Sequence, residues 1–274
     1  MGRPAEPGDP GPGAPSGGAG VVIDTHVHLH HPAFDPDREE VVTRARAAGL
    51  QVFVTLGVER RSSQEAVRLA EHFEGVYAAV GIHPRQVLSA QAGDWEALAE
   101  LAWHPKVVAV GECGLDYQPG APPMEVQQEA LRWHVRLSRF CGKPLVVHNR
   151  GADEDLLRIL EQEGAQRVVM HMFTGGPAHA EACAARGYWM SVGGPVTDCR
   201  RGELRRAVRA IPDPLLLVET DAPFAAPVPY RGRRNEPAYL PTVVEAVASL
   251  RGKRAAVLAA LTAENARRCF GLPR

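Results

Sequence analysis

Short apolar runs recur along the chain, and longer helical patterns separate them. Eight runs rich in Val, Ile and Leu stand at residues 21–23, 52–56, 76–82, 107–110, 145–147, 168–170, 188–192 and 215–218. These runs are continuously apolar, which is typical of parallel strands buried on both faces. The strand ends that they predict lie 21 to 36 residues apart, a spacing that suits a strand plus its crossover helix, which together need about 30 residues.

The segments between the runs have apolar residues at helical spacing. Across residues 126–141, apolar side chains from Val126 to Cys141 share one helical face. Similar patterns predict helices over 96–102, 154–162 and 202–211. Pro241 fits the first turn of a further helix, and Thr262 is expected to cap the last one. Eight strand–helix units predict an α/β fold of the TIM (β/α)8 barrel type, with a doubly wound open sheet as the alternative.

Residues 1–20 have a different composition from the rest of the chain. Gly and Pro supply twelve of these twenty residues, and such a segment cannot offset the entropy cost of ordering. We therefore expect a disordered tail over 1–20 without a catalytic role. Because no internal linker is visible, residues 21–274 are expected to form a single catalytic domain, close to the size of a typical TIM barrel at about 250 residues.

Composition limits the partners and the compartment. The net charge is −1, so any binding of nucleic acid must depend on local charge. No run approaches the roughly 18 apolar residues of a membrane span, and the N-terminus lacks a secretory signal. The five cysteines are scattered and form no C-x-x-C pair, which suits a reducing compartment. We expect an intracellular protein, cytoplasmic or nuclear, that is not secreted and has no membrane partner; a monomer is plausible.

Metal-binding side chains stand at the ends of most predicted strands. In Asp24-Thr-His-Val-His28, the two histidines are two residues apart on a strand and therefore share a face. Further candidates follow other strands, and the full set is His26, His28, His83, Glu112, His148, His171 and Asp221. Taken singly, each histidine could be a hydrogen-bonded core residue and Asp221 could be a helix N-cap. In a barrel, however, all these strand ends meet at one rim, where active sites lie.

The number of donors predicts two divalent ions. Four histidines and two carboxylates exceed the ligand set of one catalytic ion, so we expect a pair roughly 3.5–4 Å apart, bridged by Glu112. The first ion would take His26, His28, Glu112 and Asp221, and the second Glu112, His148 and His171. Mixed nitrogen and oxygen donors suit Zn, Mn, Co or Ni better than Mg, although Mg stays among the candidates. Nucleases and phosphatases use such pairs to activate water, and Asp221 is the expected general base.

Six short motifs contain these candidate residues: Asp24–His28, Gly81–Pro84, Gly111–Tyr117, Val147–Arg150, His171–Gly175 and Glu219–Pro223. Together they resemble the TatD family of metal-dependent deoxyribonucleases, and the chain is similar to its vertebrate TatD-domain-containing members over residues 20–272. The resemblance implies an amidohydrolase-like barrel that hydrolyses DNA, single-stranded or damaged, as a 3′-exonuclease or at damaged sites, with a role in DNA repair. It also implies that the six residues assigned above to the two ions are the metal ligands. Cys113, Met172 and Thr174 depart from the family pattern without removing a ligand.

Other residues are expected to support the site or bind substrate. His83 resembles a histidine that supports the metals or faces phosphate, Asp116 is expected to orient a ligand or cap a helix, and Arg150 to grip a phosphate or a surface carboxylate. Arg231, Arg233 and Arg234 follow the last strand and are expected to clamp a nucleic-acid backbone. Tyr117, Phe173, Phe224 and Tyr230 could stack on bases or pack in loops.

The remaining arginines and histidines receive a plainer interpretation. One group of arginines is expected to form a solvated helical face: Arg200, Arg201, Arg205, Arg206 and Arg209. One group of histidines is expected at the surface: His30, His31, His72, His104, His134 and His179.

Two other functions compete with a nuclease. Related barrels hydrolyse C–N or C–O bonds and commonly bridge their metals with a carboxylated lysine on the fourth strand. Here Glu112 holds that position, while Lys106 and Lys143 precede strands and belong to the opposite rim. The second competitor is a non-catalytic barrel that keeps metal for stability, but such a protein would be expected to have lost a ligand, and none is missing.

Overall fold

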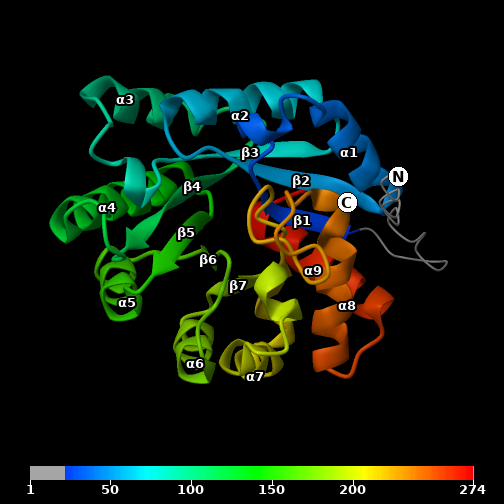
Figure 1. Ribbon diagram of the computed structural model, residues 1–274. Helices are drawn as coiled ribbons and strands as arrows, with labels where there is room; N and C mark the ends of the chain where they lie inside the picture. Colours follow the sequence, from blue (N-terminus) through cyan, green and yellow to red (C-terminus); the bar gives the residue numbers. More distant parts are fainter. Residues whose placement is uncertain (1–21, 274) are drawn as a thin grey trace, which may run out of the picture.

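The apolar runs form eight parallel strands that neighbour one another in chain order in a computed structural model, which describes residues 22–273 (Figure 1). The strands are β1 Val22–Val27, β2 Leu50–Leu56, β3 Val76–Val80, β4 Val107–Asp116, β5 Leu145–Arg150, β6 Val168–Met170, β7 Trp189–Val192 and β8 Leu216–Val218. Beyond β8, the carbonyl of Ala222 accepts a hydrogen bond of 2.8 Å from the amide of His28. The sheet therefore closes at its carboxyl end, and the predicted TIM barrel is confirmed against the open sheet.

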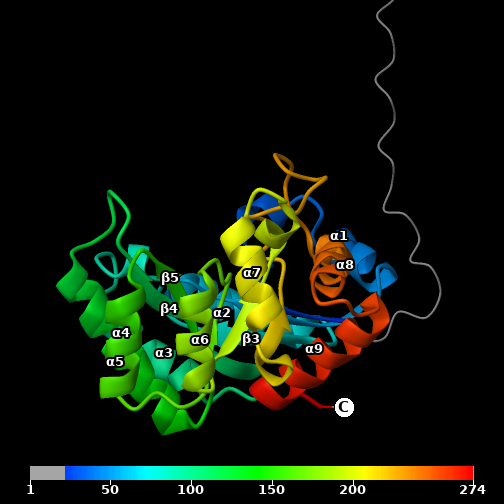
Figure 2. The same ribbon diagram turned by 90° about the horizontal axis from the view of Figure 1, so that it is seen from below.

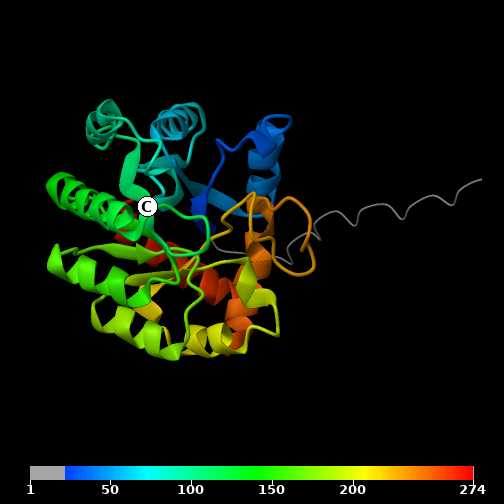
Figure 3. The same ribbon diagram turned by 60° about the vertical axis from the view of Figure 1, so that its left-hand side comes forward.

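Helices follow the strands and surround the barrel (Figures 1 and 3). Within residues 22–273 they are α1 Arg38–Ala47, α2 Arg60–His72, α3 Ala92–Leu101, α4 Met124–Cys141, α5 Asp153–Gln162, α6 Pro177–Ala185, α7 Gly202–Ala210, α8 Leu240–Leu250 and α9 Ala255–Phe270. None of these helices is long and apolar enough to cross a bilayer. The tail predicted over residues 1–20 lies outside the described residues, as do Val21 and the last residue.

The barrel interior has its own apolar core, which α9 covers at one end (Figure 2). Residues from several strands, including Ile23, Val146 and Leu217, pack there against Ala266 and Phe270 of α9. This core lies toward the amino ends of the strands, so the carboxyl rim is free for polar side chains.

Several predicted boundaries were wrong for identifiable reasons. Strands β4 and β5 continue beyond their apolar runs to Asp116 and Arg150, because their carboxyl halves carry the polar side chains of the rim. Pro241 lies in the first turn of α8 as expected.

The predicted helix cap at Thr262 was wrong. Thr262 lies inside α9, where its hydroxyl donates to the Leu258 carbonyl at 3.0 Å, a bond that serine and threonine make within helices.

Candidate metal centre

One oxygen of the Glu112 carboxylate faces a first set of donors. Its Oε2 atom lies 3.3 Å from Nε2 of His26 and 3.5 Å from Nε2 of His28. Oδ1 of Asp221 lies 3.6 Å and 3.3 Å from the same two nitrogens. The two imidazole nitrogens are themselves only 3.1 Å apart. Four side chains from β1, β4 and the segment after β8 thus direct their donor atoms to one point.

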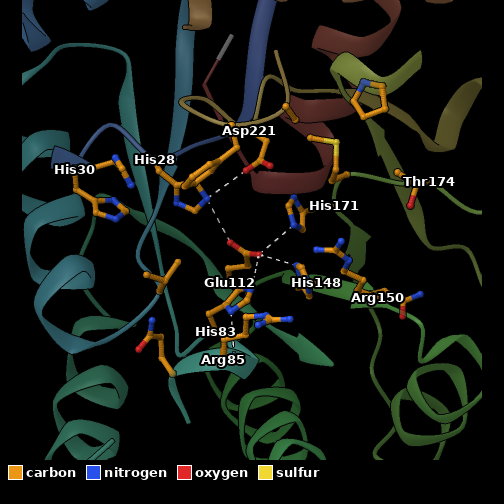
Figure 4. Close-up of a pocket in the computed structure, with 18 of the residues that line it drawn as sticks. His28, His30, His83, Arg85, Glu112, His148, Arg150, His171, Thr174 and Asp221 are labelled. Carbon is orange, nitrogen blue, oxygen red and sulfur yellow. Dashed lines mark hydrogen bonds and ion pairs between the residues drawn. The ribbon is translucent and has the colours of Figure 1, made fainter. Parts of the chain in front are cut away.

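The other oxygen of Glu112 faces a second set of donors (Figure 4). Its Oε1 atom lies 3.1 Å from Nε2 of His171, 3.3 Å from Nδ1 of His148 and 3.4 Å from Nε2 of His83. His83 therefore stands nearly as close to Glu112 as the two predicted ligands of this set do. Glu112 lies between two donor groups, and each group meets a different oxygen.

The donor atoms have the spacing that divalent ions require. An ion that binds nitrogen at about 2.0–2.1 Å in tetrahedral geometry spaces its ligands about 3.3 Å apart. Contacts of Glu112 and Asp221 with the histidines span 3.1 to 3.6 Å, so these atoms can surround common ions. Imidazole nitrogens and carboxylate oxygens are suitable ligands for Zn and similar ions. The residues present therefore fit the metal that the sequence predicts.

Two glycines in β4 allow this strand to pass close to β5. Gly114 has φ +133°, and a Cβ atom there would lie 2.0 Å from the carbonyl oxygen of His148. Gly111 has φ +136°, and its Cβ atom would lie 2.4 Å from the carbonyl oxygen of Val146. Only glycine fits these positions, so they bring the segment that carries Glu112 against the strand that carries His148.

Burial and mutual contact shift the pKa values of the central groups. Burial raises the pKa of Glu112, but the facing imidazoles of His171 and His83 outweigh it and hold that pKa well below its usual range. Burial lowers the pKa of His171, yet Glu112 and Glu219 raise it well above its ordinary value. Burial lowers the pKa of His83 to about 4. A negative charge on Glu112 is thus the stable state of the centre.

Two buried acids that the sequence analysis missed hold the donor residues in place. Oε1 of Glu219 lies 3.1 Å from Nδ1 of His171 and accepts a bond of 2.6 Å from the amide of Met172. Asp24 accepts bonds from the amide and hydroxyl of Thr220, at 3.0 Å and 2.5 Å. The sequence could have revealed both acids, because Asp24 lies in the same motif as His26 and Glu219 lies in the same motif as Asp221.

Asp116 lies on the far side of His148 from Glu112. Its Oδ2 atom is 3.5 Å from Nε2 of His148 and accepts a bond of 2.7 Å from Nε of Arg85. It also accepts a bond from the amide of Gln118 at 3.0 Å. This position suits the predicted orienting role, because partners of the outer nitrogen fix a ligating ring.

The predicted substrate-binding arginines do not all reach the cavity above the donors. Arg150 lines this cavity (Figure 4), and within residues 22–273 no carboxylate pairs with its guanidinium. Arg231 pairs with Asp198 at 2.8 Å and, with Arg233, lines a neighbouring cavity. Arg234 is directed elsewhere, since it pairs with Asp37 at 2.6 Å.

The cavity itself has a volume of about 740 Å³, and members of both donor sets line it, although the buried His26 does not. Phe224 stands at it with 49% of its surface exposed. No lysine is among the described residues that line it. Lys143 instead donates to the carbonyl of Ala102, and to that of His104 at 3.4 Å, near the start of β4. A carboxylated lysine therefore has no counterpart at this site.

Most of the other aromatic candidates are engaged in packing. The ring of Tyr230 stacks on Tyr239 with centroids 3.8 Å apart. Phe173 is buried, and the hydroxyl of Tyr117 donates to Asp155 at 2.9 Å. Of the four candidates, Phe224 is the one that offers an exposed face to the cavity.

Several side chains assigned to the surface have other positions. His134 is fully buried, and His30 and His31 line the cavity. Arg200 and Arg201 precede α7 and line the neighbouring cavity, so they do not belong to its solvated helical face. His30 and His31 follow β1, and His134 sits in a core-facing helix, so tertiary contacts override the polarity of these three. Arg200 and Arg201 are exposed as predicted, and only their place on the helix was wrong.

Comparison with known proteins decides the family. The family model described as TatD related DNase matches residues 23–271. The chain belongs to the TatD family. The metal-dependent hydrolase TatD of Mycobacterium tuberculosis is 43% identical over 260 residues, which cover 92% of this chain and 98% of that protein. The 3′-5′ ssDNA/RNA exonuclease TatD of Escherichia coli K12 is 38% identical over 258 residues, covering 92% and 99%.

Solved structures agree with this TatD membership. The crystal structure of a TatD homologue from Escherichia coli K12 superposes with a TM-score of 0.88 at 31% identity, covering 92% of this chain and 98% of that one. A TatD-family hydrolase from Entamoeba histolytica has a TM-score of 0.82 at 20% identity, which shows the shared fold. The chain is thus a metal-dependent hydrolase of the TatD family.

Proposed function

We propose that this TatD-family hydrolase removes nucleotides from the 3′ end of single-stranded DNA with the help of two divalent ions. The observation that carries the proposal is that the two carboxylate oxygens of Glu112 face different donor sets. Its Oε2 atom faces His26 and His28, while Oε1 faces His148 and His171. A carboxylate that bridges two ions is the arrangement used for in-line displacement at phosphorus. The Escherichia coli relative is named a 3′-5′ ssDNA/RNA exonuclease, which supports the substrate and the polarity proposed here.

In this proposal His26, His28, Glu112 and Asp221 would hold the first ion, and Glu112, His148 and His171 would hold the second; His83 lies beside the Glu112 oxygen of the second set. Such ions lower the pKa of a water molecule and offset the charge of a phosphodiester. Oδ1 of Asp221 is positioned to accept the proton of the attacking water, because it lies beside the first donor set at the cavity wall.

Arg150 and Phe224 have roles at the substrate. The guanidinium of Arg150 enters the cavity near His148 (Figure 4), where it can hold a phosphate oxygen. The exposed ring of Phe224 offers a face for the terminal base. Water adds to the phosphorus of the terminal nucleotide, the bond from this phosphorus to the 3′ oxygen of the remaining strand breaks, and that oxygen takes up the proton that the water gave to Asp221.

The decisive experiment supplies metal-loaded protein with end-labelled single-stranded, duplex and abasic DNA. Single-stranded RNA, a small phosphodiester and a panel of amides complete the set. We expect stepwise shortening of single-stranded DNA from the 3′ end that depends on added metal. Cleavage of amides without cleavage of phosphodiesters would overturn the proposal, and internal cuts at abasic sites would replace exonuclease action with damage-directed cleavage. Intracellular residence, a role in DNA repair and a monomeric state stay predictions.

A further inference from the structure

A second cavity opens beside the candidate metal cavity on the same rim of the barrel. It has a volume of about 770 Å³ and shares Pro195, Arg201 and Ala225 with the candidate metal cavity. Its walls come from the segment after β7 and from the segment after β8, which run side by side above the barrel (Figures 2 and 3). We refer to it as the arginine groove; its lining is Pro195, Asp198, Arg200, Arg201, Ala225, Ala226, Arg231, Gly232 and Arg233.

The arginine groove concentrates positive charge in a chain whose net charge is close to zero. Four arginines and one carboxylate line it, so positive charges exceed negative ones by three, whereas the whole chain carries −1. None of the described lining residues is aromatic. The groove is therefore suited to the charge of a polyanion and not to the stacking of bases.

A buried carboxylate fixes the geometry of two of these arginines. Asp198 is 6% exposed, and it accepts bonds of 3.0 Å from both Nε and Nη2 of Arg200 and of 2.8 Å from Nη2 of Arg231. It thus joins the two walls of the groove. A second link is the bond of 2.8 Å from the amide of Val228 to the hydroxyl of Thr197. The groove is held in shape before any ligand arrives.

Arg201 stands at the junction between the two cavities. It lines both of them, and within residues 22–273 its side chain forms no ion pair. Its charge is therefore not offset by a carboxylate. A ligand that passes from the candidate metal cavity into the arginine groove must pass this guanidinium.

We propose that the arginine groove binds the sugar–phosphate backbone of a single-stranded nucleic acid whose terminal nucleotide occupies the candidate metal cavity. The inference rests on the proposed function and adds the path of the strand beyond the reacting bond. Phosphate contacts position a strand without reading its sequence, so binding in the groove is independent of base identity. It also makes affinity depend on the length of the strand.

The test removes two groove charges and compares the result with a control of equal charge. The double variant R201Q/R231Q loses two groove arginines, while R206Q/R209Q loses two exposed arginines of α7 outside the groove. Binding of fluorescent dT3 and dT12 is measured by anisotropy in chelator, which prevents cleavage. Cleavage of both oligonucleotides by metal-loaded protein is measured separately.

We expect R201Q/R231Q to lose most of the preference of the parent for dT12 over dT3 and to show a raised KM for dT12. Each phosphate contact to a single strand contributes about a 2.6-fold loss of affinity between 50 and 200 mM salt. The loss between these salt concentrations is therefore expected to be about 7-fold smaller in R201Q/R231Q than in the parent, if both contacts are made. The control R206Q/R209Q is expected to match the parent.

Unchanged affinity for dT12 and unchanged salt dependence in R201Q/R231Q would overturn the proposal that the arginine groove binds the strand. An equal loss of affinity in R206Q/R209Q would overturn it as well. Failure of the parent to prefer dT12 would overturn it too. If the parent binds dT12 through these arginines but cleaves neither oligonucleotide, the proposed nuclease function is wrong, whereas strand binding by the arginine groove is supported.

Discussion

Glu112 carries a buried charge whose ion-pair partners within residues 22–273 are all histidines. It is 3% exposed, and each of its five ion-pair partners is an imidazole: His26, His28, His83, His148 and His171. A buried carboxylate is costly unless cations lie close to it. Either protonated imidazoles or divalent ions can supply that charge, and the ions let the histidines act as neutral ligands.

Replacement of Glu112 by Gln should abolish hydrolysis and leave the barrel folded. The amide keeps the size of the side chain but removes the charge that both donor sets share. We expect at least a thousandfold loss of kcat, about 4 kcal/mol, and fewer metal ions per chain by elemental analysis, with an unchanged circular dichroism spectrum. E181Q, an exposed substitution on α6, is the control. Hydrolysis at the parent rate in E112Q would refute the bridging role.

Replacement of Glu219 by Gln should weaken metal binding without removing a ligand. Glu219 holds Nδ1 of His171 at 3.1 Å, and partners of the outer nitrogen typically contribute about 10–100-fold to metal affinity. We expect a loss of that size in a chelator competition assay and recovery of hydrolysis at high metal concentration. Unchanged affinity would mean that Glu219 serves only the backbone of Met172.

At the scale of single elements, α4 secures the carboxyl ends of two strands. Gln127 and His134 lie seven residues apart on one buried face of this helix. Gln127 exchanges bonds of 2.8 Å and 2.9 Å with the amide and carbonyl of Asp116 at the end of β4. His134 accepts a bond of 3.0 Å from the amide of Ile82, directly before His83. One helix face therefore positions residues that flank the candidate metal centre.

The buried His134 predicts a pH dependence of stability. Burial lowers the pKa of His134 to about 4 from an ordinary 6.5, and Nε2 must stay unprotonated to accept from Ile82. Below pH 6.5, His134 binds a proton in the unfolded chain, but in the folded protein it does so only near pH 4. The contribution of neutral His134 to the free energy of unfolding is therefore complete above pH 6.5. It is lost as the pH falls toward 4, by about 3 kcal/mol in total.

Denaturant unfolding of the parent and of H134Q from pH 7.5 to 4 measures this contribution. Glutamine can accept the same bond from Ile82 but does not titrate in this range. We expect the free energy of unfolding of the parent to fall more steeply with acidification than that of H134Q. Parallel curves would show that His134 is protonated at no cost in the folded state.

At the scale of the whole molecule, stability and chemistry occupy opposite ends of one barrel. The amino end is filled by apolar side chains and covered by α9, where Asn265 donates to the carbonyls of Asp213 and Leu216 at 2.7 Å and 2.8 Å. The carboxyl end holds the buried acids and histidines. Substitutions at the rim can therefore change function while the core maintains the fold.

Metal removal should lower thermal stability, because bound ions stabilise only the folded protein. A ligand at about 100 times its Kd adds about 2.7 kcal/mol per site. We expect Tm to rise as Mn or Zn is titrated into chelator-treated protein, with binding that saturates at two ions per chain by calorimetry. Saturation at one ion would refute the two-metal proposal. The E112Q variant, which lacks the shared charge, should show a much smaller rise in Tm.

The chain by itself determined the strands, their parallel order and the rim to which the donors belong. Continuous apolar runs about one strand–helix unit apart permit few other folds, and closure of the barrel gathers every strand end at one rim. Residues His26, His28, Glu112, His148, His171 and Asp221 could therefore be placed together before any contact was known.

Only the tertiary structure decided which atoms of distant segments meet. It divided the two oxygens of Glu112 between two donor sets, brought His83 beside one of them and buried His134. It also paired Arg231 with Asp198, and Arg234 with Asp37. Residue type and local spacing do not contain this information, because a polar side chain takes its partner from segments that folding brings beside it.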